Sequence, residues 1–244
     1  RKLSLFSLVA LIAVAVACGG RSEMESMPAD EPAADAAPGP TTGDGTPMFE
    51  VDPFWPKPMP NNWLLGSTIG VAVDSRDHVW VVHRGNLGAN EMPAALDPPF
   101  AAECCFPAPP ILEFDPEGNL VGHWGGPGEG YDWPDSNHGI AVDSMDNVWI
   151  GGNGGADSHV LKFTRAGEFL LQVGEHDHEG PDSLSTTRYS QVAKVRYDAS
   201  SNEVYIADGY GNRRVAVVDA DTGELDRFWG AYGNDPDDAE LPRY

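Results

Sequence analysis

The chain has 244 residues, of which 38 are acidic and 15 are basic, so its formal net charge is −23. This balance excludes a nucleic-acid binder, because phosphate contacts need clustered lysine and arginine side chains. With 41% hydrophobic residues the chain can bury a core, and its 28 glycines and 21 prolines favour short strands joined by turns over long helices.

The N-terminus has the pattern of an exported protein. Arg1 and Lys2 precede an apolar run over residues 3–16, which fits a signal peptide and is too short for a comfortable membrane span. Small residues then precede Cys18, an arrangement that resembles the lipobox of bacterial lipoproteins, in which the cysteine is lipidated. An ordinary secretory signal with a chance cysteine is the alternative.

The lipobox resemblance implies a signal peptide over residues 1–18 and a lipid anchor as the sole membrane contact. Neither residue after Cys18 is aspartate, which favours the outer membrane, with the protein facing the periplasm or the exterior. Residues 19–48 are rich in proline, alanine and acidic residues, so we expect a solvated, disordered tether. The folded domain is expected over residues 49–244.

The rest of the chain repeats in three segments, residues 70–125, 139–174 and 194–230. Each contains four short β-rich runs with turn residues between them; GVAVDSRDHVWVV and GIAVDSMDNVWIG open the first two. Four-stranded units at this spacing are typical of β-propeller blades, so we expect an all-β fold with about three blades. The pattern resembles NHL repeats, whereas a generic β-sandwich does not predict such internal similarity.

Three blades do not close a ring, and a half-propeller would expose two sheet edges with unpaired backbone groups. NHL propellers usually have six blades. We therefore expect residues 49–244 to be the N-terminal half of a truncated propeller whose parent is six-bladed. A partner that supplies the other half is the alternative.

The first blade carries a long insertion from Gly85 to Pro109, which contains Cys104 and Cys105. In an oxidising envelope these neighbouring cysteines could form a strained vicinal disulfide or clamp a loop. A structural staple is the favoured interpretation over a redox role.

The run EHDHE, from Glu175 to Glu179, places metal-ligand residue types at short spacing. It could bind a metal at the surface. A solvated acidic loop between blades is the favoured interpretation.

Three unusual residues are expected at one end of the blades. The start of the first strand and the end of the second lie at the same end of an antiparallel blade, where propellers usually carry their function. His138 begins a first strand, while Arg84 and Tyr210 follow second strands. Ile69 and Ala193 stand at the positions that match His138, so the scaffold does not require histidine there.

The stretches GVAVDSRDHVWVVHRG, NHGIAVD and ADGYGNRR around these residues resemble the peptidyl-α-hydroxyglycine α-amidating lyase family, also called peptidylamidoglycolate lyase. That family has six-bladed propellers that cleave a peptidyl-α-hydroxyglycine into a peptide amide and glyoxylate, a carbon–nitrogen lyase reaction. The resemblance implies zinc at His138 and catalytic roles for Tyr210 and Arg84. It also implies a structural calcium ion held partly by the backbone carbonyls of Val71 and Ile140.

The implied chemistry is physically coherent. Zinc would make the substrate hydroxyl more acidic, as it does for bound water. A tyrosine ordinarily has a pKa of about 10 and needs a nearby cation to act as a base at neutral pH. Arg84 would supply that charge and could also bind a substrate carboxylate.

The resemblance covers residues 66–233 and departs from the family at several points. A catalytic zinc ion normally has three protein ligands, and one candidate is present here. Asn137 replaces the family's proline before the histidine, and Gly211 replaces a disulfide-bonded cysteine.

The sequence therefore predicts a zinc-dependent lyase that acts on a small peptide-like substrate. The alternative is a non-catalytic NHL propeller on the cell envelope that binds a ligand or a protein partner at the same face.

Overall fold

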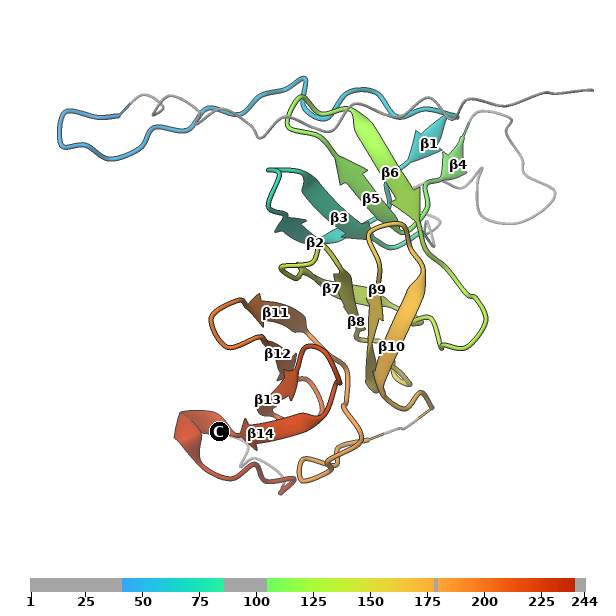
Figure 1. Cartoon of the computed structure of the whole chain (residues 1–244), viewed down its shortest axis with the longest axis vertical. Coiled ribbons are helices and arrows are strands. Elements are labelled where there is room, and N and C mark those ends of the chain that lie inside the picture. Colours follow the sequence, from blue (N-terminus) through green and yellow to red (C-terminus); the bar gives the residue numbers. More distant parts are fainter. Residues whose placement is uncertain (1–40, 86–104, 178–179, 240–244) are drawn as a thin grey trace, which may run out of the picture. The chain divides into compact units, whose positions relative to one another are not determined.

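The computed structural model describes residues 41–85, 105–177 and 180–239. Almost all regular structure in these ranges is β-strand, and the sole helical element is the 3-10 turn η2 (Ala231–Gly233) (Figure 1). No helix among these residues is long and apolar enough to cross a membrane. The expected signal peptide, its Cys18 and Cys104 lie outside the described residues.

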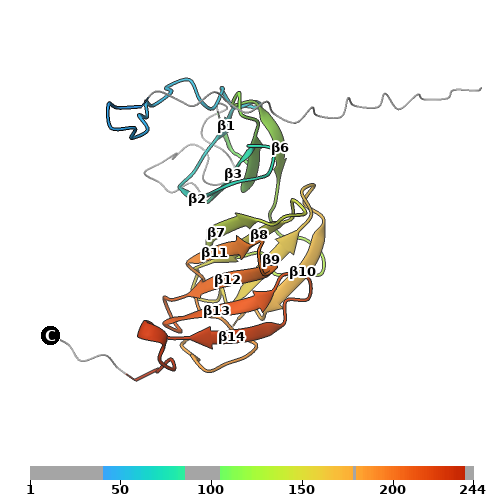
Figure 2. The same cartoon turned by 60° about the vertical axis from the view of Figure 1, so that its left-hand side comes forward.

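Three four-stranded antiparallel sheets make up the described fold (Figures 1 and 2). Within each sheet the strands pair in the order in which they follow one another along the chain. Blade 1 contains β2 (Thr68–Val73), β3 (Val79–His83), β5 (Ile111–Phe114) and β6 (Leu120–Trp124). Blade 2 contains β7 (Asn137–Val142), β8 (Val148–Gly152), β9 (His159–Phe163) and β10 (Phe169–Gly174). Blade 3 contains β11 (Lys194–Asp198), β12 (Glu203–Asp208), β13 (Arg214–Asp219) and β14 (Leu225–Trp229). The predicted all-β fold of four-stranded propeller blades is confirmed.

The predicted insertion in blade 1 lies between β3 and β5. Its described end contains β4 (Phe106–Pro107), which pairs in parallel with β1 (Trp63–Leu64) from the segment before the blade. Phe49, where the folded domain was expected to begin, is 94% exposed. Trp55 contacts blade 1, with its ring centroid 5.7 Å from that of Phe114.

A repeated aspartate shapes the turn between the first two strands of blades 1 and 2. Asp74 Oδ1 accepts hydrogen bonds from the backbone N–H groups of Arg76 and His78, at 2.9 and 3.0 Å. Its Oδ2 accepts the indole N–H of Trp80 at 3.0 Å. Asp143 and Trp149 repeat this arrangement in blade 2, with an indole N–H to Oδ2 distance of 3.2 Å. The indole N–H is thereby hydrogen-bonded while its ring is buried, so these tryptophans pack the blades.

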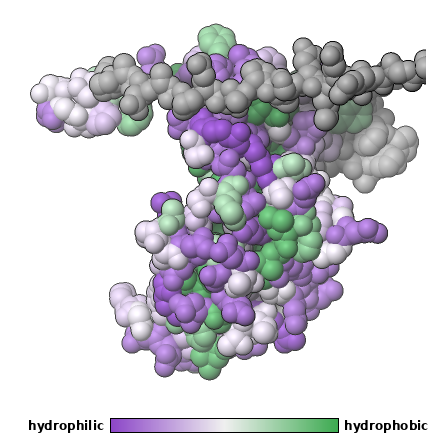
Figure 3. All heavy atoms as spheres, in the orientation of Figure 1, coloured by the Kyte–Doolittle hydropathy of each residue, from purple (hydrophilic) through white to green (hydrophobic). Residues whose placement is uncertain are grey.

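Among the described residues, two apolar cores lie between adjacent sheets, and a third packs blade 1 against Trp55, Met59 and Trp63. One cluster joins Trp80 and Ile111 of blade 1 to Ile140 and Phe163 of blade 2. A second cluster joins blades 2 and 3, and its buried residues include Trp149, Val160, Val195, Ile206 and Ala216. Hydrophilic residues cover most of the described surface in the view of Figure 3, with smaller hydrophobic areas between them. Each blade therefore depends on its neighbour to bury an apolar face.

Glycines let the first strands of adjacent blades approach at backbone distance. A Cβ atom at Gly70 of β2 would lie 2.9 Å from the carbonyl oxygen of His138 on β7 and 2.6 Å from Val82 Cγ1. A Cβ atom at Gly139 would lie 3.0 Å from the backbone nitrogen of Val195 on β11. These approaches explain why the repeat carries glycine at this position in blades 1 and 2.

Replacement of Gly70 by alanine should therefore destabilise the protein by about 1–3 kcal/mol, because the new methyl group must displace backbone of β7. Urea unfolding monitored by tryptophan fluorescence measures this loss. Gly155→Ala is the matched control, since a Cβ atom there meets nothing within 4 Å. Equal stability of the two variants would contradict the close approach.

A buried ion network links blade 1 to the turn between β9 and β10. Arg165 Nη1 lies 2.7 Å from Asp74 Oδ2, and Arg165 Nη2 pairs with the Glu113 carboxylate. The side chains of Asp74 and Glu113 are 0% and 6% exposed. The guanidinium also lies over the Trp80 ring, 5.3 Å from its centroid. One arginine of blade 2 thus compensates two buried carboxylates of blade 1.

Arg165→Ala should cost about 3 kcal/mol or more of stability, because it leaves both carboxylates buried without their cation. Thermal and denaturant unfolding give the measurement. Arg227→Ala removes an exposed arginine that pairs with Glu203 on the surface and should have a much smaller effect. A loss for Arg165→Ala no larger than for Arg227→Ala would rule out this role.

Candidate functional site

The strand registers bring the three predicted site residues to the same end of their blades. Thr68 at the start of β2 pairs with His83 at the end of β3, directly before Arg84. Lys194 at the start of β11 pairs with Ala207 near the end of β12, shortly before Tyr210. Since β7 packs against both β2 and β11, His138 lies between the other two blade ends.

His138 and Tyr210 are in ring contact. Their centroids are 5.9 Å apart, at an interplanar angle of 72°. His138 Nδ1 lies 2.6 Å from the carbonyl oxygen of Ala193, which can only accept, so Nδ1 carries the proton of this hydrogen bond. In the neutral ring, Nε2 then keeps its lone pair. Tyr210 is 58% exposed, so its hydroxyl is available to a molecule in solvent.

Arg84 lies beside His138 but has protein partners of its own. Its Nε donates to the carbonyl oxygen of Asn137 at 3.3 Å, and its Nη2 donates to Asn153 Oδ1 at 2.8 Å. These bonds tie the end of β3 to the beginning and end of the β7–β8 hairpin. Among the described residues no interaction joins Arg84 to Tyr210. No direct contact therefore supports the expected effect of the Arg84 charge on Tyr210.

The loop that carries Tyr210 is fixed by a buried network. The Asp208 carboxylate accepts hydrogen bonds from the Asn212 side chain at 2.7 Å and from Arg214 Nε at 2.8 Å. All three of these residues are at most 3% exposed. A Cβ atom at Gly211 would overlap the side chain of Ser190, so the loop needs glycine where the lyase family has cysteine.

The donor set at His138 does not by itself suit zinc. Two groups of three potential ligands occur among the described residues, and neither includes His138. A catalytic zinc ion ordinarily has three protein ligands, so His138 would need two further ligands from elsewhere. One of the groups, Asp74, His78 and Glu113, already surrounds the Arg165 guanidinium. Zinc at His138 stays a prediction.

The two residues expected to offer carbonyl oxygens to calcium lie on neighbouring first strands. Val71 of β2 is 51% exposed, whereas Ile140 of β7 is 1% exposed. The Ile140 side chain reaches the backbone of β2, where a Cβ atom at Gly70 would lie 3.1 Å from its Cγ2. The two strands are thus close, and the calcium ion itself stays a prediction.

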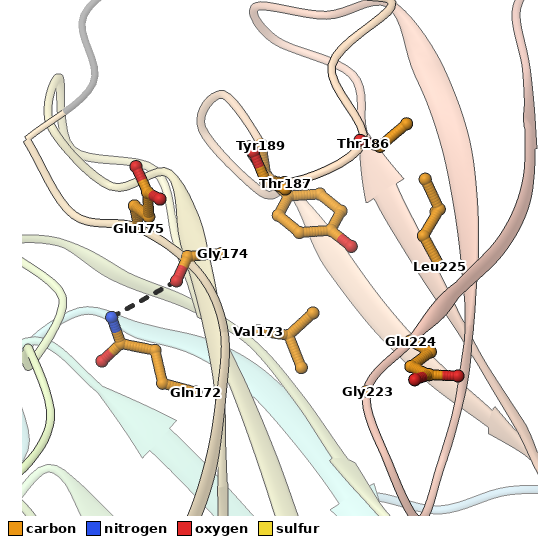
Figure 4. Close-up of a pocket in the computed structure, with 10 residues that line it drawn as sticks. All are labelled: Gln172, Val173, Gly174, Glu175, Thr186, Thr187, Tyr189, Gly223, Glu224 and Leu225. Carbon is orange, nitrogen blue, oxygen red and sulfur yellow. Dashed lines mark hydrogen bonds between the residues drawn. The ribbon is translucent and has the colours of Figure 1, made fainter.

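Two hollows lie between blades. One, of about 210 Å³, is lined by residues that include Arg84, Trp133, Asp135 and Asn137. Asn137, which lines this hollow, donates its side-chain N–H to the carbonyl oxygen of His83, while its buried Oδ1 has no hydrogen-bond partner among the residues that the structure describes. The other hollow, of about 260 Å³, lies between β10 and blade 3 (Figure 4), and Arg84, His138 and Tyr210 do not line it.

Cys105 is disulfide-bonded, as expected for a staple in the insertion. Its partner cysteine lies outside the described residues, so the pairing with Cys104 stays a prediction.

Sequence reasoning missed His83, which supports the position of Arg84. The imidazole is fully buried; its Nδ1 accepts the backbone N–H of Gly66 at 3.2 Å, and its Nε2 donates to the carbonyl oxygen of Pro109 at 2.8 Å. Burial lowers the pKa of His83 below its ordinary value. The sequence does place a histidine next to the candidate arginine. The residues around His83 in the sequence, however, do not indicate that its partners are Gly66 and Pro109.

The lowered pKa predicts a pH dependence of stability. As the pH falls below about 6.5, an unfolded chain protonates this histidine whereas the folded protein resists, so folding loses stability. His83→Gln keeps one donor and one acceptor without titrating. Between pH 7.5 and pH 5.5, the melting temperature of this variant should therefore fall by several degrees less than that of the wild type. Parallel melting curves for the two proteins would contradict a neutral buried His83.

The sheets define this chain as a β-propeller repeat protein with a histidine, a tyrosine and an arginine at one blade end. Solved structures that are similar to part of it include U3-55K, with 10% identity and a TM-score of 0.39, and the WD40 repeats of RRP9, with 11% identity and a TM-score of 0.42. Each match covers 69% of this chain and 40% of the other, so this chain spans about two-fifths of those structures. No protein-family model and no curated protein matches the sequence.

Proposed function

We propose that the blade end that carries Arg84, His138 and Tyr210 binds a small, peptide-like ligand with a carboxylate group. The observation that carries this proposal is the ring contact of His138 with Tyr210, together with the hydrogen bond from Arg84 to the residue before His138. These side chains come from three blades, and the scaffold does not require histidine at the position of His138.

Each group offers a different interaction to such a ligand. Arg84 provides a permanent positive charge at the edge of the hollow of about 210 Å³, where a guanidinium can bind a carboxylate. Tyr210 offers a solvent-facing hydroxyl, and His138 offers Nε2.

The more specific proposal is a lyase reaction on a peptidyl-α-hydroxyglycine. Tyr210, as a phenolate, would take the proton of the substrate hydroxyl, and the alkoxide would collapse to the aldehyde of glyoxylate. The carbon–nitrogen bond would break with its electron pair on nitrogen, which takes up a proton to give the peptide amide. Arg84 would hold the substrate carboxylate during this step. The proposal rests on the sequence resemblance and on the grouping of the three side chains.

A non-catalytic propeller that binds a ligand or a protein partner is the second candidate. It is favoured by the hydrogen bonds of Arg84, whose guanidinium is already engaged by Asn137 and Asn153. We also propose, from the leader sequence alone, that a lipid on Cys18 holds the protein at the bacterial outer membrane.

The test is glyoxylate release from a synthetic peptidyl-α-hydroxyglycine by the full chain, with binding of the same compound followed by calorimetry. If the lyase proposal holds, Tyr210→Phe should lower the rate at least 100-fold, because the general base is lost. Tyr232→Phe is the control, since Tyr232 is fully exposed and lies outside the cluster.

Three outcomes separate the candidates. Turnover that depends on Tyr210 supports the lyase. Binding without turnover, weakened at least tenfold by Arg84→Gln, supports the non-catalytic propeller. If the compound is neither bound nor cleaved, the assignment of this blade end to a peptide-like ligand is wrong.

A further inference from the structure

A second group of metal-ligand side chains converges in blade 2. Asp135 precedes β7, Asp157 precedes β9, and His176 follows β10. One ligand atom from each of these three residues lies within 4.8 Å of the others. In the sequence, 19 or more residues separate them, so the folded sheet creates the group.

Asp157 is held rigidly. Its Oδ1 accepts the backbone N–H of Asp135 at 2.8 Å, and its Oδ2 accepts those of Ser136 and Gly154 at 3.0 and 2.6 Å. The residue is 1% exposed. A carboxylate fixed in this way by backbone donors keeps a further lone pair on Oδ1 for another partner.

His176 faces this carboxylate without a hydrogen bond to it. Its Nε2 lies 4.0 Å from Asp157 Oδ1, is buried, and has no hydrogen-bond partner among the residues the structure describes. Its Nδ1 lies 3.0 Å from the Asp177 carboxylate. A neutral ring with Nδ1–H toward Asp177 therefore presents the Nε2 lone pair to Asp157.

His159 lies beside His176 and repeats this pattern. The ring centroids are 5.5 Å apart, and His159 is fully buried. Its Nε2 donates to the carbonyl oxygen of Asp132 at 2.6 Å, while its Nδ1 is buried without a partner in the described part of the chain. Each of these two adjacent imidazoles therefore has one nitrogen in a polar contact and one nitrogen without a partner among the described residues.

This pattern is the one that metal-binding histidines show. A ligating imidazole generally donates its other N–H to a carboxylate or a backbone carbonyl, which fixes the tautomer and the ring orientation. Imidazole nitrogen with carboxylate oxygen is a donor set that zinc accepts. Ligand atoms about 3.3 Å apart suit a tetrahedral site with bonds of about 2.0 Å, so the 4.0 Å spacing needs a small closure.

The group of Asp74, His78 and Glu113 differs from this one in its charge balance. In that group an arginine side chain lies among the ligand atoms and neutralises them. In the group of Asp135, Asp157 and His176, no lysine or arginine of the described residues forms an ion pair with either carboxylate.

We propose that Asp135, Asp157 and His176 bind a divalent metal ion of the zinc class. The sequence favoured a solvated acidic loop around His176, with a surface metal site as the alternative. The proposed site agrees with that alternative, but two of its ligands, Asp135 and Asp157, lie outside the loop. This site is separate from the zinc expected at His138 and does not depend on the proposed function.

The test is calorimetric titration of the metal-free full chain with Zn²⁺, accompanied by Co²⁺ titration for the visible absorption of a nitrogen-containing tetrahedral site. His176→Gln should weaken Zn²⁺ binding at least tenfold and abolish the Co²⁺ bands. Asp135→Asn should weaken binding as well, and it leaves the backbone N–H donated to Asp157 in place.

Two controls make the assignment specific. His123→Gln changes an exposed histidine of blade 1 that packs on Trp63, and His138→Gln removes the other candidate ligand. Both should bind Zn²⁺ as the wild type does at this site. No Zn²⁺ binding by the wild type, or unchanged binding by His176→Gln, would overturn the proposal. Loss confined to His138→Gln would overturn it too, and would place the metal at the proposed ligand-binding end.

Discussion

The fold depends on the face-to-face contact of neighbouring sheets at their first strands. Where β2, β7 and β11 meet, Gly70 and Gly139 bring backbone against backbone, and the apolar side chains on either side interdigitate. This spacing fixes the blade ends relative to one another. Arg84, His138 and Tyr210 become neighbours for that reason, although 126 residues separate the first from the last.

The repeated aspartate–tryptophan pair shows how similar blades solve one electrostatic problem differently. In blade 2, Lys162 lies 3.2 Å from Asp143 and 5.0 Å from the Trp149 centroid. Blade 1 has Glu113 at the position that matches Lys162, so its own third strand adds a negative charge. Arg165 from the next blade neutralises both carboxylates. In blade 2 the neutralising cation thus comes from the same blade, whereas in blade 1 it comes from the neighbouring blade, where it also helps to hold the two blades together.

Much of this architecture could be predicted from the sequence because it is local. Period-two apolar runs and turn residues placed the strands, and antiparallel pairing placed Arg84, His138 and Tyr210 at one end. The partners of those residues could not be predicted. Asn153 engages Arg84 from 69 residues away, and Ser190 excludes a side chain at Gly211; both effects arise from packing between blades.

Because two of the apolar clusters lie between sheets, blade 2 should open less readily than either of its neighbours. Blade 2 shares a core with each neighbour, whereas blades 1 and 3 each share one with blade 2. Local unfolding of blade 2 would therefore expose the faces of both neighbours, and its amide hydrogens should exchange most slowly with solvent. The segment that bears His138 is thus the most persistent part of the described fold, held in place even while the flanking sheets fluctuate.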